Sequence, residues 1–172
     1  MADENCSICG RTAVFYSAYL KQNLCKKHFE HMVFRRIRAA FASSGLKAKD
    51  CSLPRGNSAP AGMIRFLFKD SKGGGIRLQT NTLEDFAVSI MEYFAFSKKP
   101  NISVNSKGTF SPLYTTSEKE IAAFLDLKGI NFHEKKRKGL DAELLGILED
   151  IEKRRPGGML SIVKIGRTLG LI

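Results

Sequence analysis

Four potential metal ligands stand near the start of the chain, in the order Cys6, Cys9, Cys25 and His28. Two residues separate the members of each pair and fifteen separate the pairs, so two tight turns can present four donors to one point. Thiolates and imidazole suit Zn²⁺, and four protein ligands leave no open position for a substrate. The pattern therefore predicts a structural Cys3His zinc knuckle. Free cysteines in a small core are the alternative reading.

Residues next to these ligands refine the prediction. The stretch "TAVFYSAYL" between the pairs has the aromatic and β-branched residues of a short hairpin. His31 follows His28 by three residues and could compete as a ligand. We expect His31 instead on the exposed basic face of the following helix.

Composition limits where the protein works. The chain has 172 residues, 43% of them apolar, which is in the normal range for a globular protein. It contains no run near the roughly 20 apolar residues that span a membrane. Its first residues, "MADENCSICG", are acidic where a secretory signal would be basic and apolar. Four clustered cysteines favour metal binding in a reducing compartment. We expect a cytoplasmic protein with no membrane partner.

Net charge indicates the partner. Lys and Arg number 28 against 17 Asp and Glu, a formal charge of +11. Such an excess favours a polyanion such as RNA, because each neutralised phosphate releases counterions. The alternative is a protein that is merely basic. The basic residues gather in short patches, which favours a binding surface.

Two patches are candidate nucleic-acid contacts. The first lies on a helix predicted over residues 27–41, in which Phe29, Val33, Ile37 and Phe41 recur at helical spacing and form a buried stripe. The second is the run "HEKKRKG". The candidates are Lys26, Lys27, Arg35, Arg36, Arg38, Lys135, Lys136, Arg137 and Lys138. A solvated helix face is the alternative for the first patch.

The rest of the chain reads as an α/β domain that is rich in helices. We predict a zinc knuckle with its basic helix over residues 1–42, a Ser/Gly/Pro-rich linker over 43–62, and a reduced α/β domain over 63–172. "MIRFLF" and "IRLQT" are strand-like runs, and "KDSKGGG" between them reads as a hairpin turn. The Walker order of glycines and lysine is absent there.

Helix signals follow in the second half of the chain. Thr82 with Asp85 begins one helix, and Ser117 with Glu120 forms a capping box for the next. Leu140 to Lys153 is a further amphipathic helix, ended by "RRPGG".

Several of these segments resemble one family. The cysteine finger with its basic helix, "LYTTSEKEIAAFLDLKGINFHE" and "LGILEDIEKRRPGGMLSIVKIGRTL" are similar to stretches of the tRNA 2-thiolation proteins. Those thiouridine synthetases combine a zinc finger with a PP-loop ATP-pyrophosphatase domain. The resemblance implies a tRNA partner and a PP-loop-like fold.

The departures from that family concern its chemistry. Its ATP loop, S-G-G-K-D-S, has no counterpart in the chain, and its G-H-N-x-D-D signature is reduced to residues 80–85. Its catalytic and iron–sulfur cysteines are missing as well. Without a phosphate cradle or a reactive thiolate, adenylation and sulfur transfer lack a chemical basis. The resemblance therefore implies a non-catalytic, tRNA-binding accessory protein that pairs with a full-length thiolation enzyme or with a second copy.

Two other functions stay open. One is a minimal tRNA sulfurtransferase or other ATP-dependent enzyme that a partner subunit completes. The other is a zinc-finger module for protein docking or a DNA-binding regulator, although no reading helix of the usual finger type is present.

Overall fold

A computed structural model of the protein describes residues 5–71 and 73–172. Lys72, in the middle of "KDSKGGG", lies outside the described residues. The predicted fold class is confirmed: the chain is α/β, with the Cys3His group at its N-terminal end and helices around short strands. None of the described helices is long and apolar enough to cross a bilayer.

The N-terminal part is a hairpin followed by a long helix. Strands β1 (Phe15–Ser17) and β2 (Gln22–Leu24) pair antiparallel, as expected for the stretch between the ligand pairs. Helix α1 (Lys26–Ser44) follows at once and ends at Gly45, whose φ of 70° is the left-handed conformation common at helix ends. The four apolar residues of the predicted stripe are all buried.

A four-stranded sheet forms the centre of the larger part. Its strands are β3 (Cys51–Ser52), β4 (Ile76–Leu78), β5 (Asn105–Ser106) and β6 (Thr109–Phe110). The order is β3-β4-β6-β5, with β3, β4 and β6 parallel and β5 antiparallel to β6. Each strand has only two or three residues, so helices supply most of the core.

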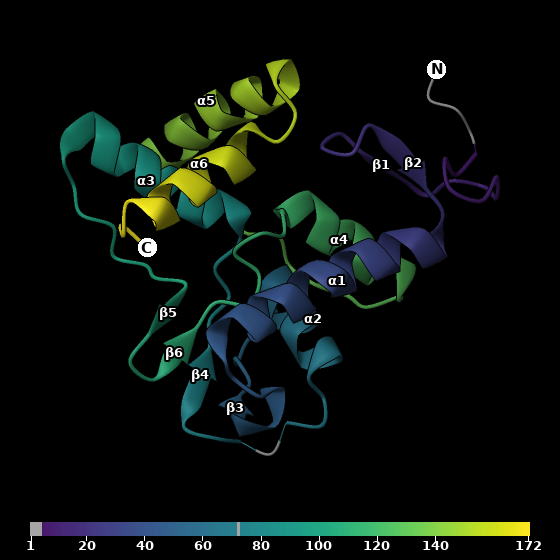
Figure 1. Ribbon diagram of the computed structural model, residues 1–172, viewed down its shortest axis with the longest axis horizontal. Coiled ribbons are helices and arrows are strands. Elements are labelled where there is room, and N and C mark those ends of the chain that lie inside the picture. The colour runs from purple at the N-terminus through teal and green to yellow at the C-terminus, as the bar shows by residue number, and fades with distance from the viewer. Residues whose placement is uncertain (1–4, 72) are drawn as a thin grey trace.

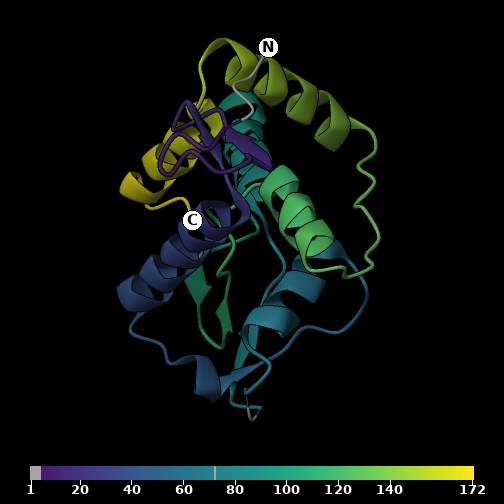
Figure 2. The same ribbon diagram turned by 90° about the vertical axis from the view of Figure 1, so that its right-hand side faces the viewer.

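Helices cover the sheet and build a second layer. A short 3-10 helix (Ala48–Asp50) precedes β3, and the α-helices are α2 (Ala59–Leu67), α3 (Leu83–Phe96), α4 (Glu118–Leu127), α5 (Leu140–Arg154) and α6 (Gly158–Thr168). In Figure 2, α1 lies on one side of the sheet, and α2 and α4 lie on the other. Helices α3, α5 and α6 pack together beside them (Figure 1).

Local signals placed the later helices correctly. Ser117 Oγ accepts a hydrogen bond from the backbone N–H of Glu120. Glu120 Oε2 accepts one from the backbone N–H of Ser117, which completes the predicted capping box of α4. The backbone N–H of Thr82 donates to Asp85 Oδ2 at 3.0 Å at the start of α3. Helix α5 begins at the predicted residue, Leu140, and ends one residue after the predicted end.

The region before β4 differs from the prediction. "MIRFLF" is not a strand: its first five residues are the end of helix α2 and Phe68 is the C-cap, because Pro60, Met63 and Ile64 share one buried face at helical spacing. The segment 43–62, predicted as a linker, contains the 3-10 helix, β3 and the start of α2. Strand β3, helix α2 and parallel strand β4 form a βαβ unit. The "KDSKGGG" segment therefore joins a helix to a strand.

One core joins the knuckle helix to the rest of the chain. Phe41 from α1 stacks edge-on against Phe110 of β6 and contacts Phe68, which follows α2. Phe34, also from α1, meets Phe124 of α4. Buried residues of α1, the sheet and all the other α-helices belong to the same cluster. The predicted division into domains stays a prediction, since α1 packs as part of the larger core.

Candidate metal centre and basic surface

The four predicted ligands come together at the N-terminal end of α1. Their donor atoms all lie within 4.8 Å of one another. The Sγ atoms of Cys9 and Cys25 are 3.7 Å apart, and His28 Nδ1 lies 3.3 Å from Cys6 Sγ and 3.4 Å from Cys25 Sγ. A tetrahedron with metal–sulfur bonds of about 2.3 Å and metal–nitrogen bonds of about 2.0 Å has edges of roughly 3.5–3.8 Å. The residues therefore fit one tetrahedral metal ion.

Backbone turns hold these ligands in place. The N–H of Gly10 donates to the carbonyl of Cys6 at 2.9 Å, which closes the first turn. Cys25 is the residue before α1, and His28 stands in its first turn. Burial alone would raise the pKa of the Cys6 thiol, but backbone hydrogen bonds at Cys25 and Ile8 and the His28 ring lower this pKa to about 5. The thiolate, which is the metal-binding form, is thereby favoured.

A row of basic residues runs along the exposed face of α1. Lys27, His31, Arg35 and Arg38 are spaced by four, four and three residues, so they share one face of the helix. All four are exposed, and none forms an ion pair within residues 5–71 and 73–172. The row is about 17 Å long at 1.5 Å per residue. We call these four residues the α1 stripe.

The stripe begins at a groove between the knuckle and the start of α1. This groove has a volume of about 1210 Å³, and Arg11, Lys26, Lys27 and His31 are among the residues that line it. Lys26 and Arg11 are exposed, like the stripe itself. Arg11 was missed in the sequence, because only the fold of the knuckle brings it beside Lys26.

Three of the residues predicted to contact nucleic acid form ion pairs with the protein's own carboxylates. Arg36 donates to both carboxylate oxygens of Glu120, at 2.7 and 2.9 Å. Arg137, whose side chain is only 5% exposed, binds Asp85 and Glu118. Lys135 also pairs with Asp85, which leaves Lys136 and Lys138 as the exposed, unpaired cations of that run among the described residues.

These carboxylates form a cluster at the starts of α3 and α4. Glu84 is buried, and both its oxygens accept the backbone N–H of Glu118 at 3.0 Å. Burial, and then the charge of Glu118, raises the pKa of Glu84 to about 7. Thr82 Oγ1 joins Asp85 and Glu118 by hydrogen bonds. The hydrogen bonds given for Glu84 among the described residues come from the start of α4, which favours a structural role.

The loop after β3 occupies the place of a phosphate loop, between a strand and a helix. Its carbonyls at Pro54 and Gly56 accept hydrogen bonds from the guanidinium of Arg65. The first N–H of α2, at Ala59, donates to the carbonyl of His133 at 3.3 Å. A phosphate cradle needs free N–H groups at this position. Here the loop turns carbonyls toward a cation, and the protein's own backbone caps the helix.

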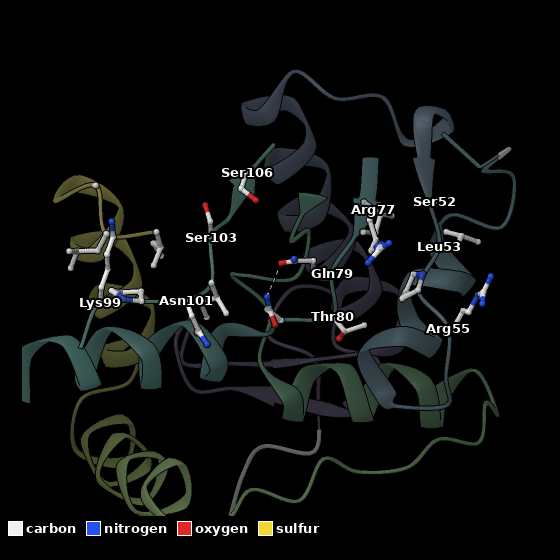
Figure 3. A pocket seen from close by; sticks show the side chains of 18 residues that line it. Ser52, Leu53, Arg55, Arg77, Gln79, Thr80, Lys99, Asn101, Ser103 and Ser106 are labelled. Atoms are coloured by element: carbon white, nitrogen blue, oxygen red, sulfur yellow. Dashed lines mark hydrogen bonds between the residues drawn. The ribbon is translucent and has the colours of Figure 1, made fainter. Parts of the chain in front are cut away.

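A second hollow opens where the parallel strands end. This cavity of about 1230 Å³ is lined by residues from 52–55, 77–81, 99–106 and 170–172. Figure 3 shows Arg55 and Arg77 on one side and Lys99 on the other, with Gln79 between them. The sequence did not point to these residues, because four separate segments supply them.

Both the N-terminal sequence and the fold are similar to those of known proteins. Residues 5–30 match the family model of the N-terminal LIM domain of the 2-thiouridine synthetase TtuA. The structure resembles the U34-tRNA thiolase NcsA from Methanococcus maripaludis with its 4Fe-4S cluster, with a TM-score of 0.82 over 98% of this chain and 88% of that chain, at 12% identity. The resemblance to the tRNA 2-thiolation family is confirmed. No curated protein sequence matches the chain.

The cluster in that thiolase raises the question of which cysteines of this chain are available as ligands. Iron–sulfur clusters are held mainly by cysteine thiolates. The chain has four cysteines in all, and three of them belong to the Cys3His group. The fourth, Cys51, is buried in β3 with its thiol 3.5 Å from the carbonyl of Lys47. Outside the knuckle, the chain therefore offers a single thiol.

Proposed function

We propose that this protein binds tRNA through its knuckle and the α1 stripe, and that it acts as a non-catalytic accessory protein in tRNA 2-thiolation. The observation that carries the proposal is the unpaired α1 stripe, which starts in the groove beside the metal ligands. Cations without internal partners remain free to replace the counterions of a phosphate backbone. The resemblance to tRNA thiolation proteins supports tRNA as the polyanion.

The metal in this proposal is a structural zinc ion. Three thiolates and one imidazole in a closed tetrahedral set favour Zn²⁺, and this set leaves no position for a substrate. The metal would fix the knuckle against α1 and so place Lys26 and Arg11 beside the stripe.

Absence of catalysis is supported by two features of this chain. The loop after β3 holds Arg65 with its carbonyls where a triphosphate would need N–H donors. Cys51, the single thiol outside the knuckle, is completely buried. We therefore propose that any sulfur transfer on the bound tRNA is performed by a partner, such as a full-length thiolation enzyme.

The test is binding of bulk tRNA and of duplex DNA across a salt series, with metal content measured on the same samples. The double variant Lys26→Glu/Lys27→Glu should bind tRNA at least tenfold more weakly and reduce the salt slope by about two. Its matched control, Arg154→Glu/Lys164→Glu, changes the same charge at exposed positions on α5 and α6 and should bind as wild type does. Equal losses in both variants, or no preference for tRNA, would refute the proposed interface.

A minimal ATP-dependent enzyme completed by a partner is the second candidate. The parallel βαβ unit and the cavity at its strand ends favour it, since nucleotides bind at that edge of such sheets. The contacts of Arg65 and Ala59 speak against it. ATP turnover by the chain with a thiolation enzyme added, and not by that enzyme alone, would support this candidate over the first.

A further inference from the structure

Helix α5 is acidic, although the chain as a whole is basic. The protein has a formal charge of +11, yet α5 carries five acids against two bases. The acids are Asp141, Glu143, Glu149, Asp150 and Glu152, and the first four are exposed. Negative charge is therefore concentrated on one helix of a cationic protein.

Most of these carboxylates form no ion pair. Over residues 5–71 and 73–172, only Asp150 of the five forms a salt bridge, with Lys153 at 3.0 Å. Both side chains of that pair are largely exposed, so the pair contributes little. Glu152 differs from the others, because its oxygens accept the backbone N–H groups of Gly157 and Met159 at the start of α6. The four exposed acids are thus open to a cation from outside the chain.

An apolar side chain lies among these acids. Ile147 is 51% exposed, and Glu143 and Asp150 flank it at spacings of four and three residues, so the three share one face of the helix. We call these three residues the α5 face. The other side of α5 is buried in the core through Leu144 and Leu148. An exposed apolar side chain with a polar rim is typical of protein–protein contacts.

RNA is not the ligand that this face favours. Carboxylates repel the phosphates of a nucleic acid. Figures 1 and 2 both place α5 apart from α1, at the outer edge of the layer formed by α3, α5 and α6. An RNA held by the α1 stripe therefore leaves the α5 face free.

A second protein that holds the same tRNA has the charge that this face needs. Proteins that bind RNA present basic surfaces. Two such proteins repel each other unless one of them offers acids at the point of contact. The α5 face supplies acids outside the α1 stripe, so two proteins can hold one tRNA at the same time.

We propose that the α5 face is the docking surface for the thiolation enzyme that acts as the catalytic partner. A basic segment of that enzyme lies along α5, with Lys or Arg side chains at Glu143 and Asp150 and an apolar side chain on Ile147. The inference rests on the proposed function and assigns the partner a surface separate from that of the RNA.

The test measures binding of the metal-loaded full chain to a purified thiolation enzyme from the same organism that carries the S-G-G-K-D-S loop, by sedimentation velocity. Glu143→Lys/Asp150→Lys should weaken the complex about tenfold, and Ile147→Ser about fivefold. The control, Asp70→Lys/Asp126→Lys, reverses the same charge at exposed acids outside α5 and should bind the enzyme as wild type does. Each variant should keep wild-type affinity for bulk tRNA, which also shows that it is folded.

The results distinguish the docking surface from the proposed function. If the α5 and control variants bind the enzyme equally, or if wild type binds tRNA but not the enzyme, the docking proposal is wrong and tRNA binding stands. If the folded α5 variants lose tRNA, or if tRNA displaces the enzyme, the α5 face belongs to the RNA surface and the proposal is overturned. A complex that depends on α5 in a chain that binds no tRNA would support the docking surface and refute the RNA-binding function.

Discussion

Arg36 and Glu120 are joined by two hydrogen bonds, which tie the basic helix to the start of α4. Glu120 also accepts the backbone N–H of Ser117, so the same carboxylate closes the capping box. The guanidinium of Arg36 lies 5.8 Å from the centre of the Tyr19 ring in the knuckle hairpin. One arginine thus connects the hairpin, α1 and α4, while its neighbour Arg35 points to solvent.

Arg36→Ala is expected to destabilise the fold by about 2 kcal/mol, because it leaves a buried carboxylate without its partner. Arg35→Ala, the matched control one residue away, should change the free energy of unfolding by less than about 0.5 kcal/mol. Urea denaturation of both variants measures the difference. Arg35→Glu should weaken tRNA binding instead. Equal stability of the two alanine variants would show that the Arg36 ion pair contributes nothing.

Stability should depend on pH through Glu84. In the folded protein its pKa is raised to about 7, whereas an unfolded glutamate titrates near about 4.3. The folded state then holds a proton that the unfolded state releases, so stability falls as pH rises through this window, by on the order of 3 kcal/mol. Glu84→Gln keeps an acceptor for the N–H of Glu118 and removes the titration. In urea denaturation, the free energy of unfolding of the variant should rise relative to that of wild type between pH 5 and pH 8.

The matched measurement for Glu84 is the difference between the two proteins at each pH, since other titrating groups cancel in it. A difference that is the same at pH 5 and pH 8 would mean that Glu84 has an ordinary pKa in the folded protein.

Metal binding should depend on Cys25. Cys25→Ser removes one thiolate of the set, so we expect loss of the metal ion and unfolding of the knuckle, because folding of such modules is driven by metal binding. Cys51→Ala is the control, since Cys51 is the one cysteine outside the Cys3His group. Elemental analysis and thermal unfolding check both. Full metal content in Cys25→Ser would exclude the Cys3His assignment.

Local signals in the sequence predicted the parts of the fold that depend on neighbours along the chain. The ligand spacing gave the metal group, and the Ser117–Glu120 capping box gave the start of α4. "MIRFLF" was assigned wrongly, because a short run of five apolar residues and one arginine fits a strand as well as a buried helix. Strands of two or three residues are too short to show alternation. The ion pair of Arg36 with Glu120 could not be predicted from the sequence, since the two residues lie 84 positions apart.

Gly74 is expected to tolerate no side chain. A Cβ atom there would lie 1.7 Å from the backbone carbonyl oxygen of Asp50, which stands directly before β3. Gly74→Ala must therefore push β3 away from β4 and should destabilise the protein by about 3 kcal/mol or more. Gly75→Ala is the control, because nothing lies within 4 Å of its Cβ position. Similar stability of the two variants would show that β3 and β4 are not held together as closely as this contact requires.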